Sequence, residues 1–212
     1  MNVSLSKRSG ILRRVLFCIL GAVCLFGPQA KATFIATIDE IGSNVVVAGS
    51  GTINFTALTF DLSGVAITAA LSPQFALFNL ASGTADQYKG INGPTSFGSG
   101  GSSFADSSSG NAVGLTGIGS RLLVPQGYVS NTPLSATSTY NNATLASLGV
   151  TQGIYTWTWG TGMNADSFSI YAGVPVPNGA VPETGSTLTL LLIPAGLMFL
   201  ATFRSRRLIS VH

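Results

Sequence analysis

Alternation of apolar and polar residues, interrupted at short intervals by glycine and proline, is the feature that most limits how this 212-residue chain can fold. Within residues 153–159 the three aromatic side chains occupy one face of an extended strand, and Ile154 and two threonines occupy the other. Residues 167–171 alternate in the same way. No stretch of residues 33–172 shows the 3.6-residue period of a helix. This part of the chain is therefore predicted to be an all-β domain.

The predicted strands are short and separated by glycine-rich turns, which favours an antiparallel β-sandwich or jelly roll. A barrel is the alternative that the periodicity leaves open. Residues 92–111 are rich in glycine and serine and have too few apolar side chains to offset the entropy of ordering, so a long surface loop is expected there. Residues 173–180 are expected to be a Pro/Gly linker. The predicted strands span residues 34–39, 44–48, 53–56, 65–68, 75–79, 121–124, 144–148, 153–159 and 167–171.

The distribution of charge argues against a nucleic-acid partner. The whole chain has a formal net charge of +3, but most of its basic residues lie near the two ends. Residues 33–180 contain two basic residues, Lys89 and Arg121, and six acidic residues, so this part carries 2 − 6 = −4. Binding of phosphates requires clustered lysine and arginine. The domain is therefore expected to be mildly acidic and to bind no nucleic acid.

The same residues lack the side chains that most catalytic and metal sites use. Cys18 and Cys24 lie in an N-terminal apolar segment, and the only histidine is His212. No catalytic residue, cofactor or metal ligand is therefore predicted in the domain. A carboxylate-dependent glycan-active enzyme is the catalytic alternative, and it needs two acidic groups about 5–9.5 Å apart. Four aspartates that lie near glycine, serine or alanine in the sequence are instead expected to cap turns: Asp61, Asp86, Asp106 and Asp166.

Five aromatic residues are candidates for stacking against sugar rings. Phe97 and Phe104 lie in the expected serine-rich loop, and Tyr155, Trp157 and Trp159 form the row on one strand face. Burial is the favoured interpretation for both groups, because aromatic side chains dominate core packing. The two phenylalanines would then anchor their loop, and the row would be the core face of its strand.

The first 32 residues have the three parts of a secretory signal peptide. Basic residues come first, residues 15–26 form an apolar segment, and Ala30 and Ala32 are the small residues that signal peptidase reads before Thr33. Twelve residues rise only about 18 Å as a helix, too little for a hydrocarbon core of about 30 Å. Cleavage before Thr33 and export are therefore predicted. A lipoprotein signal at Cys24 is disfavoured, since a valine precedes that cysteine.

The C-terminal part consists of a short motif, an apolar segment and a basic end. The apolar segment, residues 188–203, contains no charged residue and is predicted to be a transmembrane helix. The basic end contains Arg204, Arg206 and Arg207, which remain inside and place the domain outside. The signal peptide requires the same topology. The motif that precedes the helix is Val181, Pro182, Glu183, Thr184, Gly185 and Ser186.

This three-part order, across residues 181–207, resembles the PEP-CTERM class of bacterial sorting signals, and most of all its VPDSG-CTERM variant. Glu183 stands where the variant has aspartate, and Thr184 stands where it has serine. The second proline of the common form is absent, which leaves the processing enzyme open. The resemblance implies recognition by an exosortase, a membrane-embedded cysteine transpeptidase of bacteria that make exopolysaccharide. Residues 41–60, 155–160 and 166–170 resemble ectodomains that precede this signal, which implies location rather than chemistry.

The same motif differs from the sortase signal Leu-Pro-x-Thr-Gly only at Val181. A sortase would cleave between Thr184 and Gly185 and attach the protein to peptidoglycan. This alternative is disfavoured, because an apolar pocket discriminates the first residue of that signal. The expected function is a non-catalytic structural or adhesive component of the exopolysaccharide matrix or cell envelope. Its expected partners are signal peptidase, an exosortase, the membrane and polysaccharide.

Overall fold

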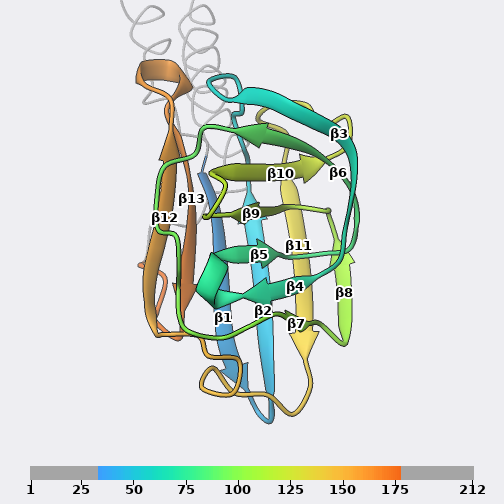
Figure 1. Ribbon diagram of the computed structural model, residues 1–212, viewed down its shortest axis with the longest axis vertical. Helices are drawn as coiled ribbons and strands as arrows, with labels where there is room; N and C mark the ends of the chain where they lie inside the picture. The colour runs from blue at the N-terminus through green and yellow to red at the C-terminus, as the bar shows by residue number, and fades with distance from the viewer. Residues whose placement is uncertain (1–32, 178–212) are drawn as a thin grey trace, which may run out of the picture.

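The computed structural model describes residues 33–177, which form two β-sheets packed face to face (Figure 1). In Figure 1 the strands of one sheet run across those of the other. In spatial order, one sheet contains β12 (Gly153–Trp159), β13 (Asp166–Ala172), β1 (Thr33–Ile41), β2 (Asn44–Gly51), β11 (Leu134–Tyr140) and β8 (Ser107–Gly110). The other contains β3 (Thr59–Ile67), β6 (Gly83–Lys89), β10 (Arg121–Pro125), β9 (Gly114–Thr116), β5 (Leu77–Asn79), β4 (Ala70–Ser72) and β7 (Ser103–Phe104).

The prediction of an all-β domain is confirmed, and the described strands form two separate sheets rather than one closed barrel. The expectation of purely antiparallel pairing is wrong at one place. β1 and β13 run parallel, with Thr33 opposite Ser167 and Ile38 opposite Ala172, whereas all other named strand pairs are antiparallel. The parallel pair arises because β13, the last strand, returns from its hairpin with β12 and lies beside the first strand in the middle of the sheet.

Two predicted strands are absent because side chains bind the backbone groups that a strand would need. In residues 144–148 the Ser147 hydroxyl accepts a hydrogen bond from the Thr144 amide, and the Thr144 hydroxyl accepts one from the Ser147 amide, which produces a turn. In residues 53–56 the Asn54 amide donates to the Asp166 carboxylate. Residues 73–75, predicted in part as strand, form a short 3-10 helix, η1 (Pro73–Phe75). A second, η2 (Gly162–Asn164), precedes β13.

The core lies between the two sheets and is built around aromatic rings. Phe168 contacts Phe34 within its own sheet and Phe78 of the other sheet, with ring centroids 4.8 and 5.8 Å apart. Gly49 makes room for this packing, since a Cβ there would lie 2.8 Å from both Phe34 and Leu80. Burying a phenylalanine side chain contributes about 1.5–3 kcal/mol. Strand alternation then directs the intervening residues of the six-stranded sheet away from the core.

The glycine-rich segment expected to be a loose surface loop is bound to the domain along much of its length. The Phe97 amide donates to the Pro73 carbonyl, and the Phe97 carbonyl accepts from the Thr151 amide. The Gly100 amide donates to the Gly149 carbonyl, and a Cβ on Gly100 would overlap the Leu148 carbonyl oxygen. Glycine in this segment therefore permits close backbone contact. The segment also contributes β7 and β8 to the two sheets.

Candidate functional site

Three of the five aromatic candidates for sugar stacking lie in the core. Phe97 and Trp157 are 1% exposed and Trp159 is 5% exposed. The indole N–H groups of Trp157 and Trp159 donate to backbone carbonyls of Pro94 and Asn54, at 2.9 and 2.8 Å. The structure therefore gives these three rings no open face for a ligand, and the burial interpretation holds for them.

The other two aromatic candidates have different surroundings. Tyr155 is half-buried, packs against Phe97 and donates a hydrogen bond from its hydroxyl to the Thr151 carbonyl. Phe104 is 68% exposed in β7, so it does not anchor its segment as the sequence interpretation expected. The two residues lie in strands of different sheets.

Asp61 and Asp86 were expected in turns, but both lie within strands of the seven-stranded sheet. A hydrogen bond from Lys89 lowers the pKa of Asp61, which also accepts from Gln87 and lies 3.5 Å from the Arg121 Nε. A hydrogen bond from the Ser63 hydroxyl lowers the pKa of Asp86, which also accepts from the Gly127 amide. Both carboxylates therefore act as charged acceptors in local networks.

Asp166 is the one buried carboxyl group among the described residues, with 5% exposure. Its two oxygens accept hydrogen bonds from the backbone amides of Asn54 and Ser167, each at 2.6 Å. Burial raises the pKa of Asp166 to about 7. The contact fastens the connection between β2 and β3 to the start of β13. No cluster of three or more potential metal-ligating side chains occurs within residues 33–177.

The outer face of the six-stranded sheet presents hydroxyl groups on every strand. One cross-strand row runs Thr37, Ala48, Thr137 and Ser109. Asp39 is the one charged side chain that the strand alternation places on this face. The hydroxyl residues that share the face are Thr156, Thr158, Ser167, Ser169, Thr33, Thr37, Ser50, Ser135, Thr137, Thr139, Ser107 and Ser109.

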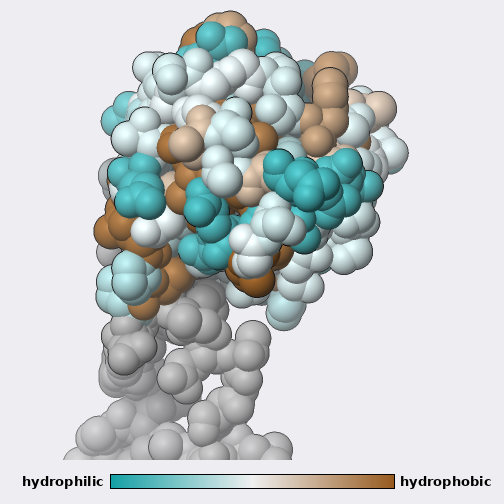
Figure 2. Space-filling view, turned by 90° about the horizontal axis from the view of Figure 1, so that it is seen from below, coloured by the Kyte–Doolittle hydropathy of each residue, from teal (hydrophilic) through white to brown (hydrophobic). Residues whose placement is uncertain are grey.

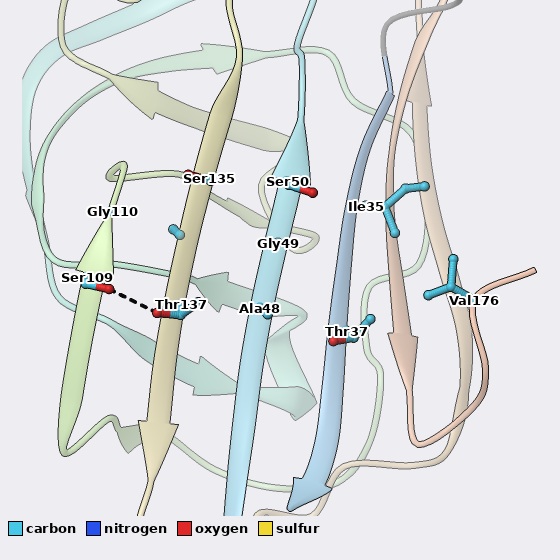
Figure 3. Close-up of a pocket in the computed structure, with 11 residues that line it drawn as sticks. Ile35, Thr37, Ala48, Gly49, Ser50, Ser109, Gly110, Ser135, Thr137 and Val176 are labelled. Atoms are coloured by element: carbon cyan, nitrogen blue, oxygen red, sulfur yellow. Dashed lines mark hydrogen bonds between the residues drawn. The ribbon is translucent and has the colours of Figure 1, made fainter. Parts of the chain in front are cut away.

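A groove of about 350 Å³ crosses this face over β1, β2, β11 and β8 (Figure 3). It is hollow because Ala48, a small residue, lies between larger neighbours in its cross-strand row. Ser109 and Thr137 hydrogen-bond to each other at 3.0 Å along one side.

Three further hydroxyls line the groove, those of Thr37, Ser50 and Ser135. Their side chains form no hydrogen bond with another residue of the described part of the chain. Figure 3 shows the oxygens of Thr37 and Ser50 on the open side of the strands. These groups are available for a ligand.

The segment after β13 forms one wall of the groove. The Gly173 amide donates to the Ile38 carbonyl at 2.8 Å, and the chain then folds back so that Val176 lies beside Ile35 (Figure 3). Val176 also borders a second hollow of about 450 Å³, which contains Asp39 and Gln152. Residues 173–177, the described part of the expected linker, thus lie against the sheet.

A row of aromatic rings that runs from the surface towards the core was not predicted. Phe60, which is 56% exposed, packs edge-on against Tyr88 with ring centroids 5.7 Å apart. Phe55 lies between Tyr88 and Tyr128, at 4.6 and 5.9 Å. These rings come from separate segments that no sequence spacing relates.

The basic side chains of residues 33–177 both lie on the seven-stranded sheet, where Lys89 and Arg121 are within ion-pair distance of Asp61. Neither lines the groove. At the end of the molecule drawn in Figure 2, apolar surface is divided into small areas by polar and neutral residues. The hydroxyl-rich face therefore has no basic side chain among the described residues, and Asp39 is its one charged group.

The segments predicted to direct export and anchoring lie outside the described residues. These are the signal peptide with Ala30 and Ala32, the motif beginning at Val181, the apolar segment 188–203 and the arginines after it. Within residues 33–177 no helix has the length and apolar character needed to cross a membrane. No protein-family model, curated protein or solved structure matches the chain.

Proposed function

We propose that this chain is an exported bacterial surface protein whose β-sandwich domain acts by binding rather than by catalysis. The signal peptide directs export, and the helix at residues 188–203 anchors the protein with the domain outside. An exosortase-type transpeptidase then processes the motif at residues 181–186. The domain contributes to the exopolysaccharide matrix or the cell envelope.

The observation that carries the binding role is the groove over β1, β2, β11 and β8 on the hydroxyl-rich outer face. The groove is lined by side chains of low reactivity, and three of its hydroxyls are unengaged within the described part of the chain. Asp61, Asp86 and Asp166 lie in hydrogen-bond or ion-pair networks away from the groove. Many weak contacts along a repeating polymer give useful avidity without strong individual sites.

The anchoring part of the proposal is tested by deleting residues 188–212 in an exporting bacterial host. We expect the truncated protein in the medium and the full-length protein with the membranes, because the deletion removes the one long apolar segment after the domain. N-terminal sequencing should give Thr33 as the first residue. A truncated protein that still sediments with membranes would contradict the proposal.

The binding part is tested by incubating the full-length protein with a glycan panel and measuring both retention and product release. We expect retention without turnover. Turnover that is abolished by replacing one aspartate, for example Asp86→Asn, would instead support a glycan-active enzyme.

A further inference from the structure

We infer that the groove over β1, β2, β11 and β8 binds a neutral polysaccharide chain that lies across the strands. This inference rests on the proposed function and names the ligand class of the same face. Its starting point is the row Thr37, Ala48, Thr137 and Ser109, which crosses four strands at one level of the sheet.

Charge selects a neutral ligand over an anionic one. No lysine or arginine lines the groove, and both basic residues of the described chain lie within ion-pair distance of Asp61 on the other sheet. Asp39, beyond Thr37 on the same strand, adds a negative charge near one side. A polymer of uronate, phosphate or sulfate groups would meet a carboxylate and no cation, which costs free energy.

The lining chemistry matches a sugar polymer. Each hydroxyl both donates and accepts hydrogen bonds, so Thr37, Ser50 and Ser135 can pair with sugar hydroxyls in either sense. Ala48 and the threonine methyl groups supply an apolar floor for the C–H faces of the rings. The groove thus combines apolar surface with a few placed polar groups, as ligand sites commonly do.

The position of the groove favours a chain over a single sugar. Four strands spaced about 4.8 Å apart give a trough about 14 Å long. Val176 closes the trough at the β1 side, whereas β8 is the edge strand of the sheet at the other side. A polymer can therefore enter past Ser109 and Gly110 and extend beyond the groove.

The experiment compares Ala48→Phe, which fills the groove, with Thr158→Phe, a matched control on β12 of the same face. Phenylalanine is favourable in strands, so both variants should fold. The full-length protein is purified in a detergent without a sugar headgroup. Calorimetric titration uses three neutral hexasaccharides, with β-1,4-, β-1,3- and α-1,4-linked glucose, and an acidic oligogalacturonate hexamer.

We expect at least one neutral hexasaccharide to bind, and Ala48→Phe to weaken that binding at least about tenfold by steric exclusion. Thr158→Phe should change the affinity less than about twofold, and the acidic hexamer should bind more weakly than the neutral one. The double variant Ser50→Ala/Ser135→Ala, which leaves the shape of the groove nearly intact, should also weaken binding.

The inference is overturned if no neutral hexasaccharide binds, if Ala48→Phe and Thr158→Phe bind equally well, or if the acidic hexamer binds more tightly. These outcomes are separate from the anchoring test. A protein that is released when residues 188–212 are deleted, yet binds no neutral hexasaccharide, refutes the ligand class and leaves export and anchoring in place.

Discussion

The two sheets share one core, but the side chains on their outer faces differ in chemistry. The six-stranded sheet has strands of four to nine residues and an outer face that is rich in hydroxyls and has one carboxylate. The seven-stranded sheet contains two-residue and three-residue strands and gathers Lys89, Arg121 and Asp61 into one ion-paired group. It also has a separate small apolar cluster around Leu123. Because both basic side chains of the described residues are paired on one sheet, the outer face of the other sheet has no cation, which suits an uncharged polymer better than an anionic one.

The largest expected effect on the free energy of unfolding comes from comparing a buried aromatic residue of one sheet with an exposed aromatic residue of the other. Trp157→Ala removes a side chain that is 1% exposed in the six-stranded sheet and should lower the free energy of unfolding by about 3–5 kcal/mol. Phe104→Ala, in the seven-stranded sheet, removes a ring that is 68% exposed and should change it by less than about 0.5 kcal/mol. Denaturant titration measures both, and equal losses would contradict the assignment of Trp157 to the core.

The next effect concerns the connection that joins the two sheets, where Asp166 binds the Asn54 amide. Burial raises the pKa of Asp166 in the folded protein to about 7, above the value of 3.8 for the unfolded chain. The free energy by which the protonated Asp166 carboxyl stabilises the fold is therefore fully present below about pH 4 and is lost as the pH rises through 7.

Asp166→Asn should remove this pH dependence, which is on the order of 1–3 kcal/mol between pH 4 and 8. The measurement is the difference in melting temperature between these pH values, with Asp106→Asn as a control on an exposed aspartate. An unchanged difference in Asp166→Asn would show that another group titrates.

A smaller change in the free energy of unfolding should distinguish hydrogen-bonded hydroxyls from hydroxyls without a partner on the outer face of the six-stranded sheet. The Thr156 hydroxyl lies 2.9 Å from that of Ser169, whereas the Thr158 side chain has no hydrogen-bond partner among the described residues. Thr156→Val should cost about 0.5–1 kcal/mol, and Thr158→Val on the same strand should be nearly neutral. Equal costs would indicate that the hydroxyls contribute through solvation alone.

The smallest effect tests the ion pairs of the seven-stranded sheet. Asp61→Asn removes the partner of Lys89 and Arg121, whose side chains are 49% and 43% exposed, so the melting temperature should fall only slightly. The wild-type carboxylate has a lowered pKa, so its contribution is present above the unfolded value of 3.8 and is lost as the pH falls below it. Added salt should diminish the difference between the two proteins. A difference that grows with salt would contradict an ion-pair origin.

Much of the local structure followed from the sequence pattern alone. The alternation in residues 153–159 correctly placed Trp157 and Trp159 on the core side and Thr156 and Thr158 on the outer side. The predicted strands at 34–39, 44–48, 121–124 and 167–171 all lie within observed strands. Such predictions succeed because the two-residue period is a property of the extended backbone itself.

Predictions failed where a distant or side-chain contact satisfied the backbone. Residues 144–148 and 53–56 have strand-like patterns, but the side chains of Ser147, Thr144 and Asp166 accept hydrogen bonds from their backbone amides, and neither segment forms a strand. Residues 92–111 were expected to form a long surface loop, yet Gly100 in this segment allows close backbone contact with Leu148 and Gly149. The partners of Asn54 and Gly100 lie far away in the chain and leave no local signature, whereas Thr144 and Ser147 compete with a strand through their own side chains.

By itself, the sequence determined the all-β character, the alternation of faces, the acidic balance of the domain and the absence of histidine and cysteine from it. Only the tertiary structure decided that β1 and β13 pair in parallel, and that Thr37, Ala48, Thr137 and Ser109 meet in one row. The extended backbone repeats every two residues, so the matching alternation of residue types can be recognised in a short stretch of sequence. The order and register of strands depend on how distant segments share one core, and a groove that crosses four strands exists only after that packing is complete.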